Sequence, residues 1–194
     1  MAEQLLLKEV LLTHATQLSV MRSLDQIIGL PVITSDAKNI GIVKDVSIST
    51  DDWKIKAIEV SQKKKILQMF SESTFIGLDS VKALSDTVVL NIPSGELVNS
   101  IEENPEGMVA NSILGTEIIL KDANRVGSAD MIFFGPDNFT VSCIRVRPER
   151  EMMETLRLHS AQPLYLKPDD IKAAGDMIIV DITKDELTTF PGAA

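Results

Sequence analysis

Residues able to do acid–base or nucleophilic chemistry are few in this sequence, and they lie apart from one another. The two histidines, His14 and His159, have no serine or cysteine nearby in the arrangement of a nucleophile and its base. The single cysteine, Cys143, excludes an intramolecular disulfide and a thiolate metal site. The sequence therefore predicts no catalytic, cofactor-binding or metal-binding residues, and it favours a protein that is not an enzyme.

Two acidic pairs, Asp51-Asp52 and Asp169-Asp170, are the remaining candidates for binding a metal ion. The first lies at a predicted turn and the second at a predicted helix start, where carboxylates accept hydrogen bonds from the backbone. No glycine-rich phosphate-binding loop is present in the sequence. We therefore interpret both pairs as turn and capping residues.

Basic side chains are the candidates for binding a partner. They form one group around the end of the first repeat's third strand and one at the equivalent place in the second repeat, and an acidic partner could dock on either. Glutamates interleave with them, so a solvated face of mixed charge is the alternative. The candidates are Lys54, Lys56, Lys63, Lys64, Lys65, Arg145, Arg147, Arg150 and Arg157.

Composition limits the possible partners. The net charge of -9 disfavours a protein that binds nucleic acid by neutralising phosphates. The apolar fraction of 44% and the charged fraction of 24% are typical of a soluble globular protein, and no apolar run has the length of a membrane span. The first residues lack the basic start and unbroken apolar segment of a secretion signal. The sequence thus predicts a cytoplasmic protein without a membrane span.

An internal duplication determines the elements that must position these side chains. Residues 27–60 align without a gap with residues 113–146, and nine of the aligned pairs are identical. A second alignment, of residues 75–92 with residues 165–182, has an offset of 90 instead of 86. Two related units of about 70 residues follow, each near the lower size limit for a stable core.

Alternating apolar residues and turn signals predict mostly β structure in each unit. In the first repeat we expect strands at residues 31–34, 40–49, 53–60, 75–78 and 87–92, with a helical turn at 80–84. Within residues 53–60 the apolar face switches midway, which predicts a bulge or a sharp bend. In the second repeat, the insertion at residues 147–163 is predicted to contain a short amphipathic helix.

The expected organisation has five parts. The N-terminal part has leucines at helical spacing, and its apolar stripe is predicted to pack on the protein's own units or to pair with another subunit, which would give a homo-oligomer. The parts are an N-terminal amphipathic helix at 1–24, a first repeat at 25–93, an acidic linker at 94–112, a second repeat at 113–183 and a flexible tail at 184–194.

The repeated glycines and aspartates, followed by a late glycine–aspartate turn, make each repeat similar to the PRC-barrel family. The family usually has glycine after the turn aspartate, where this chain has Ala37 and Ala123, so we expect a turn that needs no positive φ there. The structural repeat positions that carry the resemblance are Gly29, Asp36, Gly41, Asp86, Gly115, Asp122, Gly127, Gly175 and Asp176.

The resemblance implies a fold of two tandem small PRC-like β-barrels, as in the reaction-centre H subunit, the ribosome maturation factor RimM and short archaeal proteins. Two rigid barrels with related but divergent faces favour a protein-interaction adaptor without cofactors, and the resemblance to archaeal members implies division-machinery partners such as SepF and FtsZ. An RNA-processing or ribosome-assembly factor resembling RimM is the alternative. A small ligand bound between the barrels is a third possibility, which would require an apolar pocket with a few polar groups.

Overall fold

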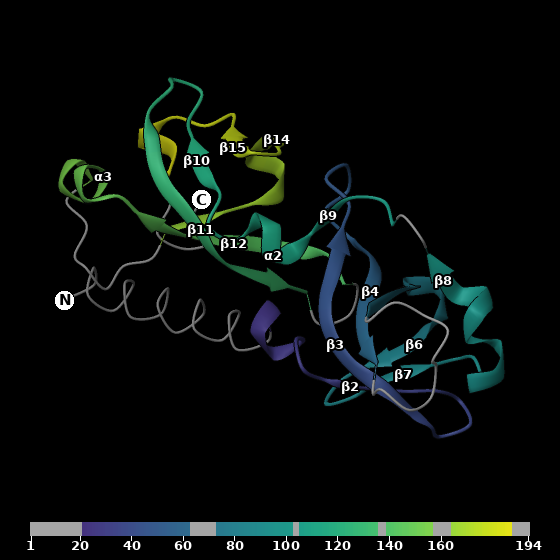
Figure 1. Ribbon diagram of the computed structural model, residues 1–194. Helices are drawn as coiled ribbons and strands as arrows, with labels where there is room; N and C mark the ends of the chain where they lie inside the picture. Colours follow the sequence, from purple (N-terminus) through teal and green to yellow (C-terminus); the bar gives the residue numbers. More distant parts are fainter. Residues whose placement is uncertain (1–20, 63–72, 103–104, 136–138, 157–163, 188–194) are drawn as a thin grey trace, which may run out of the picture. The chain divides into compact units, whose positions relative to one another are not determined.

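The chain divides into two units, each built on one β-sheet (Figure 1). Unit 1 comprises residues 1–23 and 112–194, and unit 2 comprises residues 24–111. The computed structural model describes residues 21–62, 73–102, 105–135, 139–156 and 164–187. The N-terminal helix predicted at 1–24 therefore falls almost wholly outside the described residues.

Unit 2 is a sheet with the strand order β6-β7-β2-β3-β4-β5-β8, in which β9 also pairs with β3. The pair β2 and β7 is parallel, whereas β3 is antiparallel to both β2 and β4. The strands are β2 (Pro31–Ile33), β3 (Asn39–Ile48), β4 (Ile55–Gln62), β5 (Ser73–Gly77), β6 (Val81–Leu84), β7 (Val88–Leu90), β8 (Ile101–Glu102) and β9 (Met108–Val109). The 3-10 helices are η1 (Leu24–Gln26), η2 (Leu78–Ser80) and η3 (Ser94–Ser100).

Unit 1 has the corresponding order, β14-β15-β10-β11-β12-β13, and β1 pairs with β11. Here β10 and β15 form the parallel pair. The strands are β1 (Arg22–Ser23), β10 (Glu117–Ile119), β11 (Arg125–Phe134), β12 (Val141–Pro148), β13 (Leu164–Leu166), β14 (Ile171–Ala174) and β15 (Met177–Val180). The helices are α2 (Ala110–Ile113) at the boundary between the units, α3 (Arg150–Thr155), η4 (Pro168–Asp170) and η5 (Lys184–Glu186). The short helix predicted in the 147–163 insertion is confirmed as α3.

The long hairpin of each unit is bulged at the same places. The register of β3 on β4 shifts between Val43 and Asp45, which makes Lys44 a bulge residue, and the register of β11 on β12 shifts around Asp130 in the same way. A second shift lies where Ser47 and Ile48 of β3 face β4. The irregularity that the sequence predicted in the third strand is thus confirmed. Bulges increase the local twist and bend a strand, and Figure 1 shows β3 and β11 strongly curved.

The turn after the first strand of each repeat corrects one expectation. Ala37 and Ala123 have φ of 61° and 63°, so this turn does require the left-handed conformation that we expected it to avoid. The amide of Ala37 donates to the carbonyl of Thr34 at 2.9 Å, and the amide of Ala123 donates to that of Leu120 at the same distance. These hydrogen bonds impose the tight turn, and alanine tolerates its backbone angles at a cost of about 1–2 kcal/mol.

The repeated glycine of the long hairpin is required by close packing of two backbones. A β-carbon added to Gly41 would lie 2.1 Å from the carbonyl oxygen of Ser61, and one added to Gly127 would lie 2.0 Å from that of Arg147. No side chain fits at such distances, so the β3–β4 and β11–β12 pairs require glycine here.

Two further expectations differ from the structure. Residues 81–84, placed in a predicted helical turn, form the strand β6 after the 3-10 helix η2, because they pair with Val88–Leu90. The predicted linker at 94–112 is largely part of unit 2, since it contributes η3, β8 and β9. The sequence gives no alternating apolar pattern for β8 and β9, because each of these strands has only two residues. Of the predicted tail, residues 184–186 form η5 and residues 188–194 lie outside the described part.

The core of each unit is formed by the inward-facing residues of its sheet. Cys143 is fully buried at the position equivalent to Ala57. The largest fully buried side chains include Ile48, Ile55, Ile58 and Leu90 in unit 2 and Ile118, Ile132, Phe134 and Ile144 in unit 1. Across the described ranges, no helix combines the length and the apolar character needed to span a membrane.

Candidate functional site

Most of the described basic residues that were predicted to bind a partner form ion pairs with carboxylates of their own unit. Lys56 binds Asp52 at 3.0 Å, and this contact raises the pKa of Lys56 and lowers that of Asp52. Arg150 binds Glu154 one turn along α3 at 2.9 Å. Lys54 is exposed. Lys63, Lys64, Lys65 and Arg157 lie outside the described residues.

Arg145 and Arg147 both converge on one carboxylate of their own sheet. Arg145 Nε lies 2.7 Å from Asp130 Oδ1, and Arg147 lies 3.6 Å from Asp130 Oδ2. The positions equivalent to Asp130 and Arg145 in unit 2 are Lys44 and Glu59, whose charged atoms are also 2.7 Å apart. The bulge residue therefore forms an ion pair across the sheet in both units, with the charges reversed. Asp130 offsets one of the two positive charges of Arg145 and Arg147, which weakens their candidacy as a docking surface.

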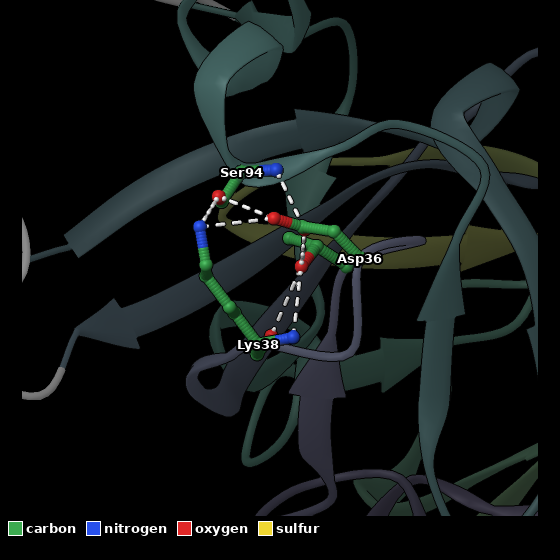
Figure 2. Close-up of polar contacts among 4 residues, drawn as sticks. Asp36, Lys38 and Ser94 are labelled. Atoms are coloured by element: carbon green, nitrogen blue, oxygen red, sulfur yellow. Dashed lines mark hydrogen bonds and ion pairs between the residues drawn. The ribbon is translucent and has the colours of Figure 1, made fainter.

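A second polar cluster surrounds Asp36, one of the repeat positions (Figure 2). Its carboxylate accepts hydrogen bonds from the Ser94 amide at 2.9 Å and the Ser94 hydroxyl at 2.8 Å, and it lies 3.0 Å from Lys38 Nζ. Lys38 Nζ also donates to Ser94 Oγ at 2.7 Å. The Thr34 hydroxyl and then the Ser94 amide hold the pKa of Asp36 well below its usual range.

This cluster contains a serine beside a lysine, which is one arrangement of a nucleophile and a base. The lysine, however, is mostly exposed, forms an ion pair with Asp36 and donates a hydrogen bond to Ser94, so the geometry gives it a structural part. The cluster instead fixes the hairpin turn to the start of η3. In unit 1 the equivalent turn is fixed by a different contact, the ion pair of Lys121 with Glu186 at 3.4 Å. The Glu186 carboxylate also accepts a hydrogen bond from the Thr183 amide, which holds the pKa of Glu186 at about 2.

Other groups with chemical potential are buried in structural positions. Burial raises the pKa of the Cys143 thiol to about 12, so it is protonated at neutral pH and is not a nucleophile. Burial also raises the pKa of Asp45, which accepts hydrogen bonds from the backbone amides of Val46 and Asn111. Among the described residues no group of three His, Cys, Asp or Glu could hold a metal ion. His14 and His159 lie outside the described residues.

The most distinctive surface feature is an apolar row that occurs once in each unit. In unit 2 it runs across the sheet from Ile33 on β2 to Val89 on β7 and Ala83 on β6, which are register partners. In unit 1 the equivalent residues are Ile119, Ile179 and Ala173. We call each set an apolar row.

These rows face outward, because the residues that alternate with them point into the core. Val32, Val88 and Ile178 are essentially fully buried, whereas Ile179 is 43% exposed and the neighbouring Met177 is 44% exposed. Core positions stay apolar because burial requires it, but an outward position has no such constraint. Two of the three positions are nonetheless identical between the repeats, Ile33 with Ile119 and Ala83 with Ala173.

A lysine stands beside each row. Lys82 and Lys172 are identical between the repeats and occupy the register shifts of β6 and β14, which end their sheets in the described structure. Neither ammonium group has a hydrogen bond or ion pair with a residue that the structure describes. A lysine at a bulge also protects a sheet edge from unwanted pairing, which is a structural role for both. Each row therefore combines an apolar surface with one available positive charge.

In unit 2 the row lines a groove of about 530 Å³. Ile33, Val89 and Leu90 form its apolar part, Thr34, Ser35 and Ala37 of the hairpin turn form one wall, and Lys82 and Asn91 complete it. The Asp36 cluster thus fixes the turn that shapes this groove. A smaller pocket of about 270 Å³ in unit 1 lies elsewhere, between the 123–125 turn and α3, and has charged residues of both signs.

Sequence reasoning missed the two rows. The signal was present, since Ile33, Lys82 and Ala83 are identical to their counterparts at the two offsets. Alternation in strands of three or four residues does not say which face points outward, so these identities were compatible with a core role. Pairing and burial were needed to place them on the surface.

Comparison with known protein families identifies part of this architecture. Residues 20–97 match the PRC-barrel domain model, so the chain contains a PRC-barrel domain over the first repeat. The resemblance inferred from the sequence is confirmed there. No curated protein matches the chain.

Proposed function

We propose that this protein is a non-enzymatic interaction adaptor of the cytoplasm, built from two PRC barrels that descend from one ancestral copy. The second barrel is supported by unit 1, which has the strand order, the bulges and the positive-φ residues of unit 2. The archaeal form of this proposal, a division scaffold that acts with proteins such as SepF and FtsZ, rests on the family resemblance.

The observation that carries the proposal is the apolar row present in both units. Each row places three apolar residues in register on adjacent strands, where they are partly or fully exposed, and exposed apolar surface is typical of protein-binding sites. The adjacent Lys82 and Lys172 favour a carboxylate on the partner. The expected occupant is thus a protein segment that presents apolar side chains next to an acidic residue. Two rows on one chain would let the protein hold two such segments.

The experiment is a quantitative pull-down from native lysate with the full-length protein as bait. Val89→Glu and Ile179→Glu place a charge in one row each without touching the core. Val98→Glu is the matched control, because Val98 is a 58% exposed apolar residue on η3 and lies outside both rows. A partner of the rows should be recovered after nuclease treatment, be lost in a row variant and be retained with Val98→Glu.

A direct measurement with the purified partner completes the test. We expect each row variant to weaken binding at least tenfold, and Lys82→Glu or Lys172→Glu to weaken it further than Lys54→Glu. Equal affinity of the row variants and the Val98→Glu control would refute the rows as the binding surface. A ribosome-assembly role resembling RimM would instead give nuclease-sensitive recovery of precursor RNA, and the net charge of -9 weighs against it.

A further inference from the structure

The segment that directly precedes each repeat is a strand of the opposite unit. The strand β1 leads into η1 of unit 2 without an intervening residue, yet it pairs with β11 of unit 1. The strand β9 leads directly into α2, yet it pairs with β3 of unit 2. We call β1 and β9 the leader strands.

The two leader strands pair in the same register. Ser23 is the partner of Phe133, and Val109 is the partner of Ser47. All four positions are related by the repeat offset of 86, as are the neighbouring pairs Arg22 with Phe134 and Met108 with Ile48. The exchange is therefore reciprocal, which one accidental contact would not produce.

The family match places the first leader strand in the same domain as the first repeat. The PRC-barrel domain model begins at residue 20, so it includes residues 22–23 in the same domain as the first repeat. The compact unit that contains this repeat begins only at Leu24. Exchange of an equivalent element between two copies of a fold is the arrangement of domain swapping, here within one chain.

The edge of β3 is built to hold its leader strand. The Ser47 hydroxyl donates to the carbonyl of Glu106 at 2.6 Å, and Asp45 accepts from the amide of Asn111 at 3.3 Å. Gly107 passes so close that a β-carbon there would lie 2.0 Å from the carbonyl oxygen of Ile48. These contacts hold the 106–111 segment at both ends of β9, and a buried carboxylate is retained to make one of them.

The edge of β11 holds its leader strand by different means. Met131 and Phe133 stand where unit 2 has Asp45 and Ser47. Met21 stands at the position of Gly107. The pairing of β1 with β11 thus lacks the equivalents of the Asp45, Ser47 and Gly107 contacts. We expect it to be the weaker of the two.

We propose that the edges of β3 and β11 are strand-binding sites whose partner is the leader strand of the other repeat, so that the two halves of the chain hold each other by reciprocal exchange. The N-terminal half, residues 1–103, donates β1 to β11, and the C-terminal half, residues 104–194, donates β9 to β3. Cutting the chain between these halves should therefore not separate them. This proposal is independent of the apolar rows and of any external partner.

The test uses the full chain with a protease recognition sequence inserted between residues 103 and 104. After cleavage of the folded protein, size-exclusion chromatography with light scattering should show one species with the mass of the intact chain, and urea should release two pieces. Separation of the cleaved halves under native conditions would overturn the proposal.

Variants assign this association to the leader strands. Gly107→Val introduces the side chain that the β3 edge cannot accommodate, and Ser23→Pro removes a backbone donor from β1. The control is Gly95→Val, because no atom lies within 4 Å of a β-carbon at Gly95. In the cleaved protein, the first two changes should weaken association of the halves at least tenfold and Gly95→Val should not. Equal association of all three variants would contradict the proposal.

Engineered disulfides in the uncut chain do not depend on destabilising variants. Directly opposed residues of antiparallel strands lie about 4.5–5.5 Å apart, within the range of a disulfide. With Cys143→Ala removing the native thiol, the pairs Ser23→Cys with Phe133→Cys and Ser47→Cys with Val109→Cys should each close within one chain. The pair Ser23→Cys with Ser47→Cys, which would close if β1 paired with its own repeat, should not. Closure of that pair, or disulfides between two chains, would refute exchange within the chain.

Discussion

At the bulge of the long hairpin, unit 2 pairs Lys44 with Glu59, whereas unit 1 pairs Asp130 with Arg145. The contact distance is 2.7 Å in both units, although each charge has been replaced by its opposite. The backbone bulge that brings the two side chains together is the same. The comparison teaches that the duplicated fold retains its backbone irregularities and requires complementary partners at this position, but it does not require particular residues.

The same division between backbone and side chains holds elsewhere in the two units. Trp53 and Phe139 differ in size, yet both have a positive φ, 52° and 54°. The turn of unit 2 is fixed by Asp36 and Ser94, whereas unit 1 uses Glu186 near its equivalent turn. Polar contacts have thus diverged around a common backbone.

The largest expected effect tests the common backbone. Gly41→Ala and Gly127→Ala should each lower the free energy of unfolding of their own unit by about 3 kcal/mol, because the new methyl group meets a backbone carbonyl and the strands must move. Urea unfolding followed by amide hydrogen exchange reports each unit separately.

Gly29→Ala and Gly115→Ala are the controls for this comparison. Both glycines have φ of 86°, but nothing lies within 4 Å of an added β-carbon. Strain alone should cost about 1–2 kcal/mol. If Gly41→Ala costs no more than Gly29→Ala, the close approach is not what requires glycine. A large effect in only one unit would break the equivalence of the two backbones.

The next effect concerns the reversed ion pair. Lys44→Asp places a third carboxylate beside Asp45 and Glu59, both nearly buried, and should cost about 2 kcal/mol. Adding Glu59→Arg installs the arrangement of unit 1 and should recover most of this loss, which a double-mutant cycle measures as a coupling energy. If the double variant is no more stable than Lys44→Asp, the two units do not share interchangeable pairs.

A smaller effect depends on pH and separates the units through Asp45, which unit 1 replaces by Met131. Burial raises the pKa of Asp45 above its ordinary value of 3.8, so the folded state binds the proton more tightly than the unfolded state. Its contribution to stability is therefore present at acid pH. It declines as the pH rises from the ordinary pKa of 3.8 in the unfolded chain through the raised pKa in the folded state. Urea unfolding between pH 4 and 7 should show that Asp45→Asn gains stability relative to the wild type as the pH rises.

Two other carboxyls act in the opposite direction and provide the control for that experiment. Hydrogen bonds lower the pKa of Asp36 and of Glu186, so their contributions are lost as the pH falls. Because this loss lies below the ordinary Asp36 pKa of 3.8, the matching series for Asp36→Asn runs from pH 2 to 5, where the variant should lose stability relative to the wild type as the pH rises. Parallel curves for Asp45→Asn and Asp36→Asn would show that burial does not govern Asp45.

The smallest expected effect is a gain. Ala37→Gly and Ala123→Gly relieve a left-handed conformation, and the gain is partly offset by the greater freedom of glycine in the unfolded chain. Each should raise the unfolding free energy of its unit by about 0.5 kcal/mol, measured by chemical denaturation. A loss in either unit would mean that the alanine side chain makes a contact worth more than its strain.

Much of the fold could be predicted because the repeat reports each element twice. The hairpin strands and the irregular third strand follow from apolar patterns that the two copies share. The positive φ of Ala37 could not be predicted, since alanine has no preference for it and the turn's hydrogen bonds impose it. The strands β8 and β9 were also hidden, because two residues carry no periodicity.

The candidate site was less accessible to sequence reasoning. The basic clusters can be found in the sequence, but their acidic partners across the sheet, such as Asp130 for Arg145, depend on the bulge register. The apolar rows require knowledge of which face points outward. The partners of the leader strands were beyond reach, because segments related by the repeat offset match either sheet equally well.

The reciprocal exchange also bears on how the two halves of the gene can diverge. A substitution at Val109 affects the pairing with Ser47, and a substitution at Ser23 affects the pairing with Phe133. Each half of the gene therefore encodes a strand that completes the sheet of the other half. Neither half can drift freely, be lost or be transplanted into another protein without leaving the other incomplete. Inheritance of the pair as a single gene keeps donors and acceptors together.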